Sequence, residues 1–405
     1  MSEIKVNSVK GVGASTAAIT INNTDGTCDA NLTAISGSQL SGRNMMANGA
    51  MQVAQRLSYQ SSGYDQTGGD YYGIDMFKTR VESSGANINS KQQTFDAPTG
   101  FLESLKVTVT SADTALAAGV YHSIVGHIEG YDIVRTAFGG SGAKTLTLSF
   151  YVKSNLTGTF TGSIGNAGNN RSYAFDYTIS SANTWERKTI TFAGDTTGTW
   201  HKDNQLGLKI NWALAVGTDY LTSTATTWQA SEHMGTTNGQ NVLASTDNYW
   251  AITGVQLEVG SVATAFEHRP WCDEFKRCCR YYQKSRQYGQ PNQEAPQTWN
   301  TPEGTLSAVK HNQYYDTHTF FPNGSMRVNP TITFVGTNGA VNNFRFEIPG
   351  VRNNELAVSL NTITVNLDGF FLRLSPGSGT PDDNGYRSGS GNAFHRATFF
   401  VNAEM

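Results

Sequence analysis

The sequence predicts an all-β protein, a jelly-roll β-sandwich followed by a smaller C-terminal β-sandwich tip domain. One short helix joins the two, and an extended segment precedes them. Several stretches, such as Lys106–Val109 and Thr145–Phe150, alternate apolar and polar residues as half-buried strands do. Clusters of Gly, Asn and Ser separate these stretches, as turns between strands require. Helical spacing is convincing in one place, where apolar residues fall at Trp271, Phe275 and Cys278.

Residues 1–42 form the predicted N-terminal segment. They contain no large aromatic residue, and short strands are expected near Val6 and at Ala18–Ile21. Asp25-Gly26 is a dipeptide that favours a tight hairpin. A segment this poor in bulky side chains cannot bury a core alone, so we expect partners to order it. The alternative is a flexible leader.

Residues 43–270 are interpreted as one jelly-roll sandwich, because about eight strands are separated by long, turn-rich connections. The expected strands are Met76–Val81, Leu105–Thr110, Tyr121–Ile128, Leu146–Val152, Tyr173–Ile179, Arg187–Phe192, Leu206–Leu214 and Tyr249–Val259.

The connecting helix is predicted over residues 271–289. Pro270 suits the entry of a helix, and the acidic pair Asp273 and Glu274 occupies its first turn. Basic residues follow towards its end, at Arg277 and Arg280, with the sign that the helix dipole favours. This helix is therefore expected to set the joint between the two β domains.

Residues 290–405 are interpreted as the smaller tip domain. A hairpin is expected over Leu356–Leu367, turning at Asn361-Thr362, and the loop Ser375–Asn392 is expected to be exposed and to carry ligand contacts. The expected strands are Thr305–Val309, Thr317–Phe321, Thr331–Val335, Phe344–Ile348, Leu356–Leu360, Ile363–Leu367, Phe370–Leu374 and Ala397–Val401.

Composition excludes several classes of protein. Only 15% of the residues are charged and the formal net charge is -3, which argues against a nucleic-acid partner. No apolar run is long enough to insert into a membrane. The start Met1-Ser2-Glu3 lacks the features of a signal peptide, so we expect synthesis in a cytoplasm. The cysteines do not form the pattern of a disulfide framework.

The stretch ITGVQLEVGSVATAFEHRPWCDEFKRCCRYYQKS, residues 252–285, resembles a signature of tailed-phage tail fibres and receptor-binding proteins with a jelly-roll carbohydrate-binding-like domain. Further blocks are similar to that group in the same order. They are RNMMANGAMQVAQR (43–56), YYGIDMFKTR (71–80), IEGYDIVRTAFGGSGAKTLTLSFYVKSNLTGTF (128–160), WERKTITFAGDTTGTW (185–200), FFPNGSMRVNPTITF (320–334) and ATFFVNAEM (397–405).

The resemblance implies a structural virion protein, located in the tail and made in the host cytoplasm. It implies a homotrimer that attaches to phage tail or adaptor proteins through residues 1–42 and binds a host-surface glycan or a protein receptor. No enzymatic activity and no cofactor are expected. Two alternatives stay open: a tail or collar decoration protein with a purely structural role, and a polysaccharide depolymerase.

The sequence contains no Gly-x-Ser-x-Gly, His-Glu-x-x-His or Cys-x-x-Cys motif, so these enzymatic templates do not match. The stretch Phe138–Thr145 is similar to a phosphate-binding loop, but Ala143 stands where that loop has glycine. His268, Cys272, Cys278 and Cys279 match no usual zinc spacing, and we expect the thiols to pack. Asp75, or Asp70, with Glu258 is a candidate calcium site, because calcium requires only oxygen ligands. The alternative is that Glu258 is an edge carboxylate paired with arginine or water.

Aromatic side chains are the candidate ligand contacts, because sugar rings stack on them. In the sandwich, Trp200, Tyr220 and Trp228 lie in turn-rich surroundings and could form a platform, whereas Trp185 and Trp212 adjoin strands and are expected in the core. In the tip, the candidates expected in accessible loops are Tyr314, Tyr315, Asp382, Asp383, Tyr386 and His395. For each residue taken alone, a structural role is the alternative.

Overall fold

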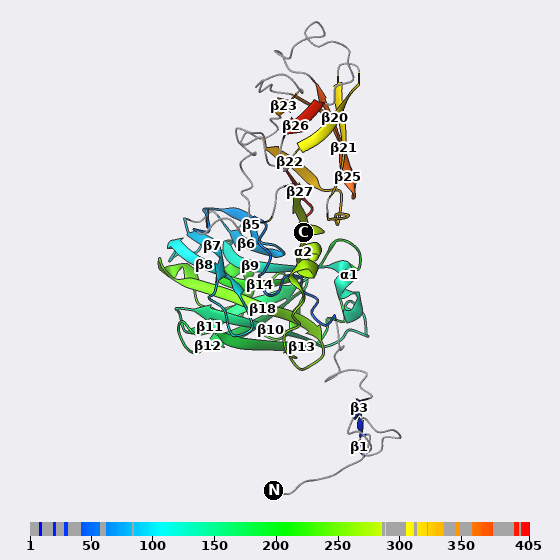
Figure 1. The fold of residues 1–405 in the computed structure, drawn as a ribbon. Helices are drawn as coiled ribbons and strands as arrows, with labels where there is room; N and C mark the ends of the chain where they lie inside the picture. Colours follow the sequence, from blue (N-terminus) through cyan, green and yellow to red (C-terminus); the bar gives the residue numbers. More distant parts are fainter. Residues whose placement is uncertain are drawn as a thin grey trace.

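A computed structural model shows the fold of the chain (Figure 1). The structure describes residues 8–9, 19–21, 28–30, 42–56, 62–82, 85–285, 288, 305–311, 314–321, 323–335, 345–347, 359–375, 393–396 and 398–405. The predictions at Asp382, Asp383 and Tyr386, and nearly all of the predicted loop 375–392, lie outside these residues.

Two antiparallel sheets form the sandwich, which confirms the predicted all-β jelly-roll fold. The six-stranded sheet has the order β13 (Glu186–Phe192), β10 (Leu146–Ser154), β18 (Tyr249–Val259), β8 (Glu103–Ser111), β7 (Asn87–Thr94) and β4 (Tyr64–Gln66). The seven-stranded sheet has the order β16 (Trp228–Gln229), β12 (Ser172–Ile179), β11 (Gly158–Gly165), β14 (Leu206–Val216), β9 (Tyr121–Glu129), β6 (Phe77–Val81) and β5 (Gly69–Ile74).

The core lies between these sheets and follows from the period of two along each strand. In β14, Leu208, Ile210, Trp212 and Leu214 alternate and are fully buried. Trp212 packs edge to face with Phe150 of the opposite sheet, with ring centroids 5.7 Å apart. The expectation that Trp212 is a core residue is therefore confirmed.

Short elements connect the strands at the ends of the sandwich. The helix α1 (Gly130–Ile133) continues from β9 and leads into the 3₁₀ turn η1 (Val134–Thr136). Two further 3₁₀ turns are η2 (Thr218–Tyr220) and η3 (Val242–Ala244). The strands β15 (Leu221–Thr222) and β17 (Gly235–Thr236) pair in parallel between them.

The connecting helix is shorter than the prediction. The helix α2 spans Trp271–Cys279, and the chain then forms the strand β19 (Tyr282–Lys284). β19 pairs with a strand near the other end of the C-terminal unit, β27 (Thr398–Asn402). Tyr282 follows Cys278 by four residues, which is also helical spacing, but in the structure it pairs with Asn402 of β27 in the sheet.

The described residues of the C-terminal unit form two sheets. One has the order β19, β27 and β22 (Thr331–Val335). The other has the order β23 (Arg345–Glu347), β26 (Ala393–Arg396), β20 (Thr305–His311), β21 (Tyr314–Phe320), β25 (Gly369–Ser375) and β24 (Ser359–Val365). Their core includes Phe334, Phe370, Leu372 and Phe399.

Two predictions for this unit are wrong. The hairpin turning at Asn361-Thr362 does not form, because β24 runs through both residues with a register shift between Leu360 and Thr362. Tyr314 and Tyr315 lie in β21, and His395 lies in β26, so none of the three is in a loop. Their backbones pair with neighbouring strands.

The last residues of the chain return to the sandwich. Arg327 of the C-terminal unit donates from Nε to the carbonyl oxygen of Ala403, 3.0 Å away. Asn204 of the sandwich donates to the carbonyl oxygen of Arg327, also at 3.0 Å. Figure 1 shows the C-terminus beside α2, with the N-terminal strands β1 (Ser8–Val9) and β3 (Cys28–Ala30) on the other side of the sandwich. Both of these strands pair with β2 (Ile19–Ile21).

Candidate functional site

Trp200 and Trp228 do not form a surface platform, which corrects the sequence-based prediction. Trp200 is only 6% exposed, and its ring packs edge to face against Trp228 with centroids 5.5 Å apart. Phe138 packs against both rings, at 4.9 Å and 5.7 Å. The indole nitrogen of Trp200 donates to the carbonyl oxygen of Thr197 at 3.1 Å. Trp200 is therefore part of the core, and Trp228, although half-buried, closes its edge.

Tyr220 lies apart from that cluster. It is half-buried and packs edge to face on Tyr121 of β9, with ring centroids 4.8 Å apart. Trp185 was expected in the core but is half-buried at the surface, where its indole nitrogen donates to Asp96 at 3.3 Å. The structure therefore does not bring the predicted sandwich aromatics together into one site.

The outer face of the seven-stranded sheet carries polar groups beneath Tyr121. The side-chain oxygens Ser123 Oγ and Asn211 Oδ1 are buried and have no hydrogen-bond partner among the described residues. The recess beside them, lined by Ala213 and Thr236 among others, has a volume of about 40 Å³. This volume suits one water molecule and is too small for a sugar ring.

Asp75 and Glu258 lie in different parts of the sandwich. Asp75 accepts hydrogen bonds from the backbone and side-chain nitrogens of Gln55, at 3.0 and 2.6 Å. The carboxylate of Glu258 accepts from Gln256 at 2.8 Å and from the backbone nitrogen of Thr264 at 2.9 Å. Within the part of the chain that the structure describes, no group of three or more His, Cys, Asp or Glu residues could hold a metal ion. The two carboxylates thus have separate partners and form no common site.

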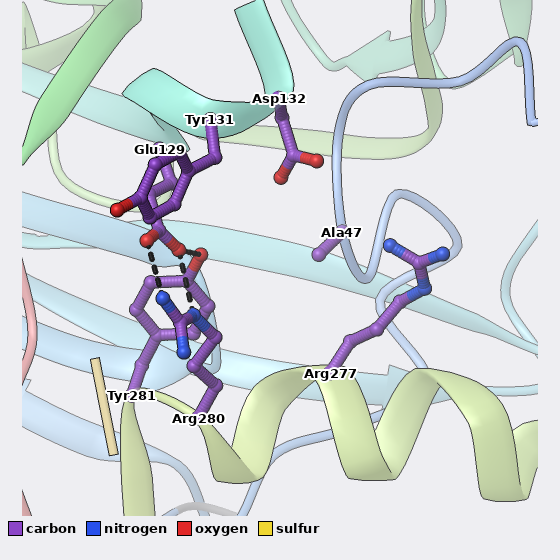
Figure 2. A pocket seen from close by; sticks show the side chains of 7 residues that line it. All are labelled: Ala47, Glu129, Tyr131, Asp132, Arg277, Arg280 and Tyr281. Atoms are coloured by element: carbon purple, nitrogen blue, oxygen red, sulfur yellow. Dashed lines mark hydrogen bonds and ion pairs between the residues drawn. The ribbon is translucent and has the colours of Figure 1, made fainter. Parts of the chain in front are cut away.

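A larger recess, called here the joint pocket, lies where α1 meets α2 (Figure 2). It has a volume of about 220 Å³. Its lining consists of Ala47, Glu129, Tyr131, Asp132, Arg277, Arg280 and Tyr281.

Glycine allows α1 to sit close to the sheet at this point. A Cβ atom on Gly130 would lie 2.6 Å from the carbonyl oxygen of Asp203, and one on Gly207 would lie 2.7 Å from the Cα atom of Gly130. Contacts this short are not tolerated between non-bonded heavy atoms, so both positions require glycine. Their close approach places Tyr131 and Asp132 at the rim of the joint pocket.

One wall of the pocket is a closed ion-pair network. The buried carboxylate of Glu129 accepts two hydrogen bonds from the Arg280 guanidinium, at 2.6 and 2.9 Å, and one from the Tyr281 hydroxyl at 2.7 Å (Figure 2). Burial and the charge of Glu129 raise the pKa of Tyr281, so its hydroxyl remains a donor. All three side chains are therefore occupied, and they fix α2 against β9.

The other wall carries two charged side chains that are not engaged in the ion-pair network, Asp132 and Arg277. Figure 2 shows Asp132 from α1 and Arg277 from α2 on facing sides of the space beside Ala47. Neither the Asp132 carboxylate nor the Arg277 guanidinium has a hydrogen-bond partner among the described residues. Burial raises the pKa of the Asp132 carboxyl, while the charge of Arg277 opposes this effect. Tyr131, 60% exposed, adds an aromatic ring at the rim.

The joint pocket was not found from the sequence. Its lining comes from three separate segments, and the two arginines had already been explained by the dipole of α2. The block IEGYDIVR, residues 128–135, contains three of the lining residues but carries no motif of known chemistry. Only the fold brings Asp132 and Arg277 to one space.

No protein-family model matches the chain, and no curated protein matches it. Solved structures do match. The enzymatically active domain of tailspike protein 4 of bacteriophage CBA120 is 10% identical with a TM-score of 0.27, and the match covers 53% of this chain and 21% of that chain. This chain thus spans about a fifth of that tailspike chain.

Carbohydrate-binding modules also match. TmCBM61, solved in complex with β-1,4-galactotriose, is 8% identical with a TM-score of 0.27, covering 54% of this chain and 99% of that one. The family 11 module from Clostridium thermocellum, in complex with a β-1,3-1,4-mixed-linked tetrasaccharide, is 13% identical with a TM-score of 0.26, covering 50% and 100%. Scores of this size assign neither a ligand nor an activity to the chain.

Proposed function

We propose that the chain is a receptor-binding protein of a tailed-phage virion, a tail fibre or spike, whose joint pocket takes one unit of a host-surface glycan. The observation that carries the proposal is the facing pair of Asp132 and Arg277, whose side chains have no hydrogen-bond partner among the residues that the structure describes. The resemblance of residues 252–285 to phage receptor-binding proteins supports the virion part of the proposal.

The chemistry of the pocket suits a neutral polyhydroxyl ligand. Its lining holds two acidic and two basic side chains, so the charges cancel. A carboxylate accepts hydrogen bonds from sugar hydroxyls, and a guanidinium donates to sugar oxygens in a fixed fork. The exposed ring of Tyr131 offers a surface for the apolar face of a sugar. A volume of about 220 Å³ limits the ligand to about one ring.

We propose a binding role without catalysis and without a cofactor. Glycoside hydrolysis generally uses two carboxylates with separate roles. Of the two carboxylates in the pocket lining, Glu129 is engaged by three hydrogen bonds, which leaves Asp132. This arrangement supports binding over hydrolysis.

The proposal includes a homotrimer attached through residues 1–42 to tail or adaptor proteins and located in the virion. Weak single sites then gain avidity from repetition on one particle. Native mass spectrometry of the full chain, and of the chain without residues 1–42, tests the assembly. A trimer that persists without this segment would place the trimer contacts elsewhere.

The binding part is tested with the full chain on an array of purified bacterial surface oligosaccharides, followed by affinity measurements on the ligands found. We expect Asp132→Ala and Arg277→Ala each to weaken binding by a factor of roughly ten or more, because each removes hydrogen bonds to a charged group. Lys276→Ala is the matched control, since Lys276 is the exposed neighbour of Arg277 on α2 and does not line the pocket.

The outcomes separate the alternatives. If the chain binds and both substitutions leave the affinity unchanged, the joint pocket is not the site. If no oligosaccharide binds, a collar or tail decoration role replaces receptor binding. If the length of a polysaccharide falls during incubation with the chain, the protein is a depolymerase.

A further inference from the structure

Lysine side chains form a line across the outer face of the six-stranded sheet. Lys91 of β7 lies directly opposite Lys106 of β8 in the strand register. Lys106 lies opposite Ala251 of β18, and Ala251 lies opposite Lys153 of β10. We call Lys91, Lys106 and Lys153 the lysine row. Neighbouring strands are about 4.8 Å apart, so the row spans about 14 Å over four strands.

The burial pattern shows which way the row faces. The residues before and after each lysine in β8 and β10, such as Leu105 and Val152, are fully buried in the core. Side chains alternate between the two faces of a strand, so the lysines face away from the core. All three are partly exposed.

Aromatic rings flank the lysine row. The ammonium group of Lys106 lies 4.3 Å from the ring centroid of Tyr249, which is two residues from Ala251 and therefore on the same face. The ammonium group of Lys153 lies 5.3 Å from the ring centroid of Trp185. The ammonium groups of Lys106 and Lys153 thus each lie beside an aromatic ring.

Stability does not account for this arrangement. Like charges directly opposite each other on a sheet are destabilising, as at Lys91 and Lys106. Lys153 pairs with Asp96, whereas neither Lys91 nor Lys106 forms an ion pair among the described residues. Asp65, near the edge of this face, is engaged by the side chain of Asn89 at 2.8 Å. The row therefore retains the positive charges of Lys91 and Lys106 outside any ion pair among the described residues.

We propose that the lysine row binds an anionic polysaccharide. Its carboxylate or phosphate groups pair with the ammonium groups of Lys91, Lys106 and Lys153, and its sugar rings contact Trp185 and Tyr249. A row that crosses four strands suits an extended polymer rather than a small molecule. This surface lies on β7, β8, β18 and β10 and shares no residue with the joint pocket, so the inference is independent of the proposed function.

A polysaccharide is favoured over a nucleic acid. Nucleic-acid binding draws its affinity from many phosphate contacts, whereas this row offers three cations on a chain of net charge -3. Polysaccharides that carry carboxylates and those that carry phosphates would both pair their anionic groups with the lysine ammonium groups. The experiment below distinguishes the two kinds of polymer.

The experiment measures affinity of the full chain for polygalacturonate, for a phosphorylated mannan, for uncharged dextran and for a short DNA duplex. We expect binding to one of the two anionic polysaccharides, weakening as salt rises, and no binding to dextran. Lys91→Gln with Lys106→Gln should weaken that binding at least tenfold. Lys202→Gln with Lys276→Gln removes the same charge from exposed positions elsewhere and should leave it within twofold.

Three results would overturn the inference: no binding to either anionic polysaccharide, equal affinity after loss of Lys91 and Lys106, or tighter binding to the DNA duplex. Thermal unfolding of both double variants shows that each is folded. Asp132→Ala should leave this binding unchanged, which separates failure of the lysine row from failure of the joint pocket.

Discussion

The guanidinium of Arg56 lies 3.0 Å from the carboxylate of Glu404, although the two residues are 348 positions apart in the sequence. Their side chains are only 11% and 6% exposed. The same guanidinium lies 3.6 Å from the ring centroid of Tyr282 on β19. This ion pair therefore holds the last residues of the chain against the sandwich beside the start of the C-terminal unit.

Replacing Arg56 by alanine should reduce the free energy of unfolding by roughly 3–5 kcal/mol, because it leaves the Glu404 carboxylate buried without its partner. Equilibrium unfolding in urea measures the loss. Arg277→Ala, at an exposed position, is the control and should change stability by less than about 0.5 kcal/mol. A loss below about 1 kcal/mol for Arg56→Ala would mean that water reaches Glu404.

Stability should fall as the pH rises through the range in which Asp75 ionises. Burial raises the pKa of Asp75 from 3.8 to about 6, an effect that the charge of Arg56 opposes. The folded protein therefore binds a proton that the unfolded chain releases at lower pH. By linkage, the free energy of unfolding decreases between about pH 4 and pH 6, by on the order of 2–3 kcal/mol.

Asp75→Asn should remove this part of the pH dependence. The measurement is the difference in unfolding free energy between variant and wild type at pH 4, 5, 6 and 7. Asp219→Asn, at an exposed position on η2, should leave the pH dependence as it is. A constant difference across this range for Asp75→Asn would contradict the raised pKa.

Of the three cysteines on α2, only Cys272 should react with iodoacetamide in the folded protein. Cys272 is exposed, whereas Cys278 and Cys279 are buried. Burial raises the pKa of Cys279 to about 12 and that of Cys278 well above its usual value, so neither forms the reactive thiolate at neutral pH. Peptide mass spectrometry identifies the modified sites, and rapid labelling of Cys278 would show that α2 opens.

Trp200→Ala should destabilise the sandwich by about 3–5 kcal/mol, as truncation of a large core residue does. At temperatures where the variant is folded, glycan affinity should match that of wild type, because Trp200 is not at the surface. Urea unfolding and array binding test the two parts separately. A stable variant with lost binding would restore Trp200 as a ligand contact.

Strands in which apolar and polar residues alternate clearly were predicted well. A strand whose glycines let the neighbouring backbone come close was not predicted. β18 has the bounds expected, Tyr249–Val259. β11 was missed, because Gly158, Gly162 and Gly165 interrupt its pattern. Gly162 is needed, since a Cβ atom there would lie 2.4 Å from the carbonyl oxygen of Asn211 on the neighbouring strand. That requirement depends on the pairing of strands that are distant in the sequence.

The candidate sites were harder to predict, for a related reason. Turn-rich surroundings indicated exposure for Trp200, but Phe138 and Trp228 pack against its ring. Tyr173 and Phe192, from two further segments, pack against Trp228 in turn. Conversely, Lys91, Lys106 and Lys153 are unremarkable in the sequence, and only the strand register aligns them. The burial of an aromatic ring and the alignment of charged side chains depend on which strands are neighbours in the sheet. The pattern of residues within a single stretch of sequence does not contain this information.

The return of the last residues to the sandwich has a mechanical consequence. The chain leaves the sandwich through α2 and β19 and comes back through β27, and these two strands pair antiparallel with each other. A pulling force on the C-terminal unit therefore acts on two chain segments and on the Arg56–Glu404 ion pair at the same time. A single flexible linker would instead let the two units reorient independently. We expect such a double connection to transmit torque, so that rotation of one unit turns the other.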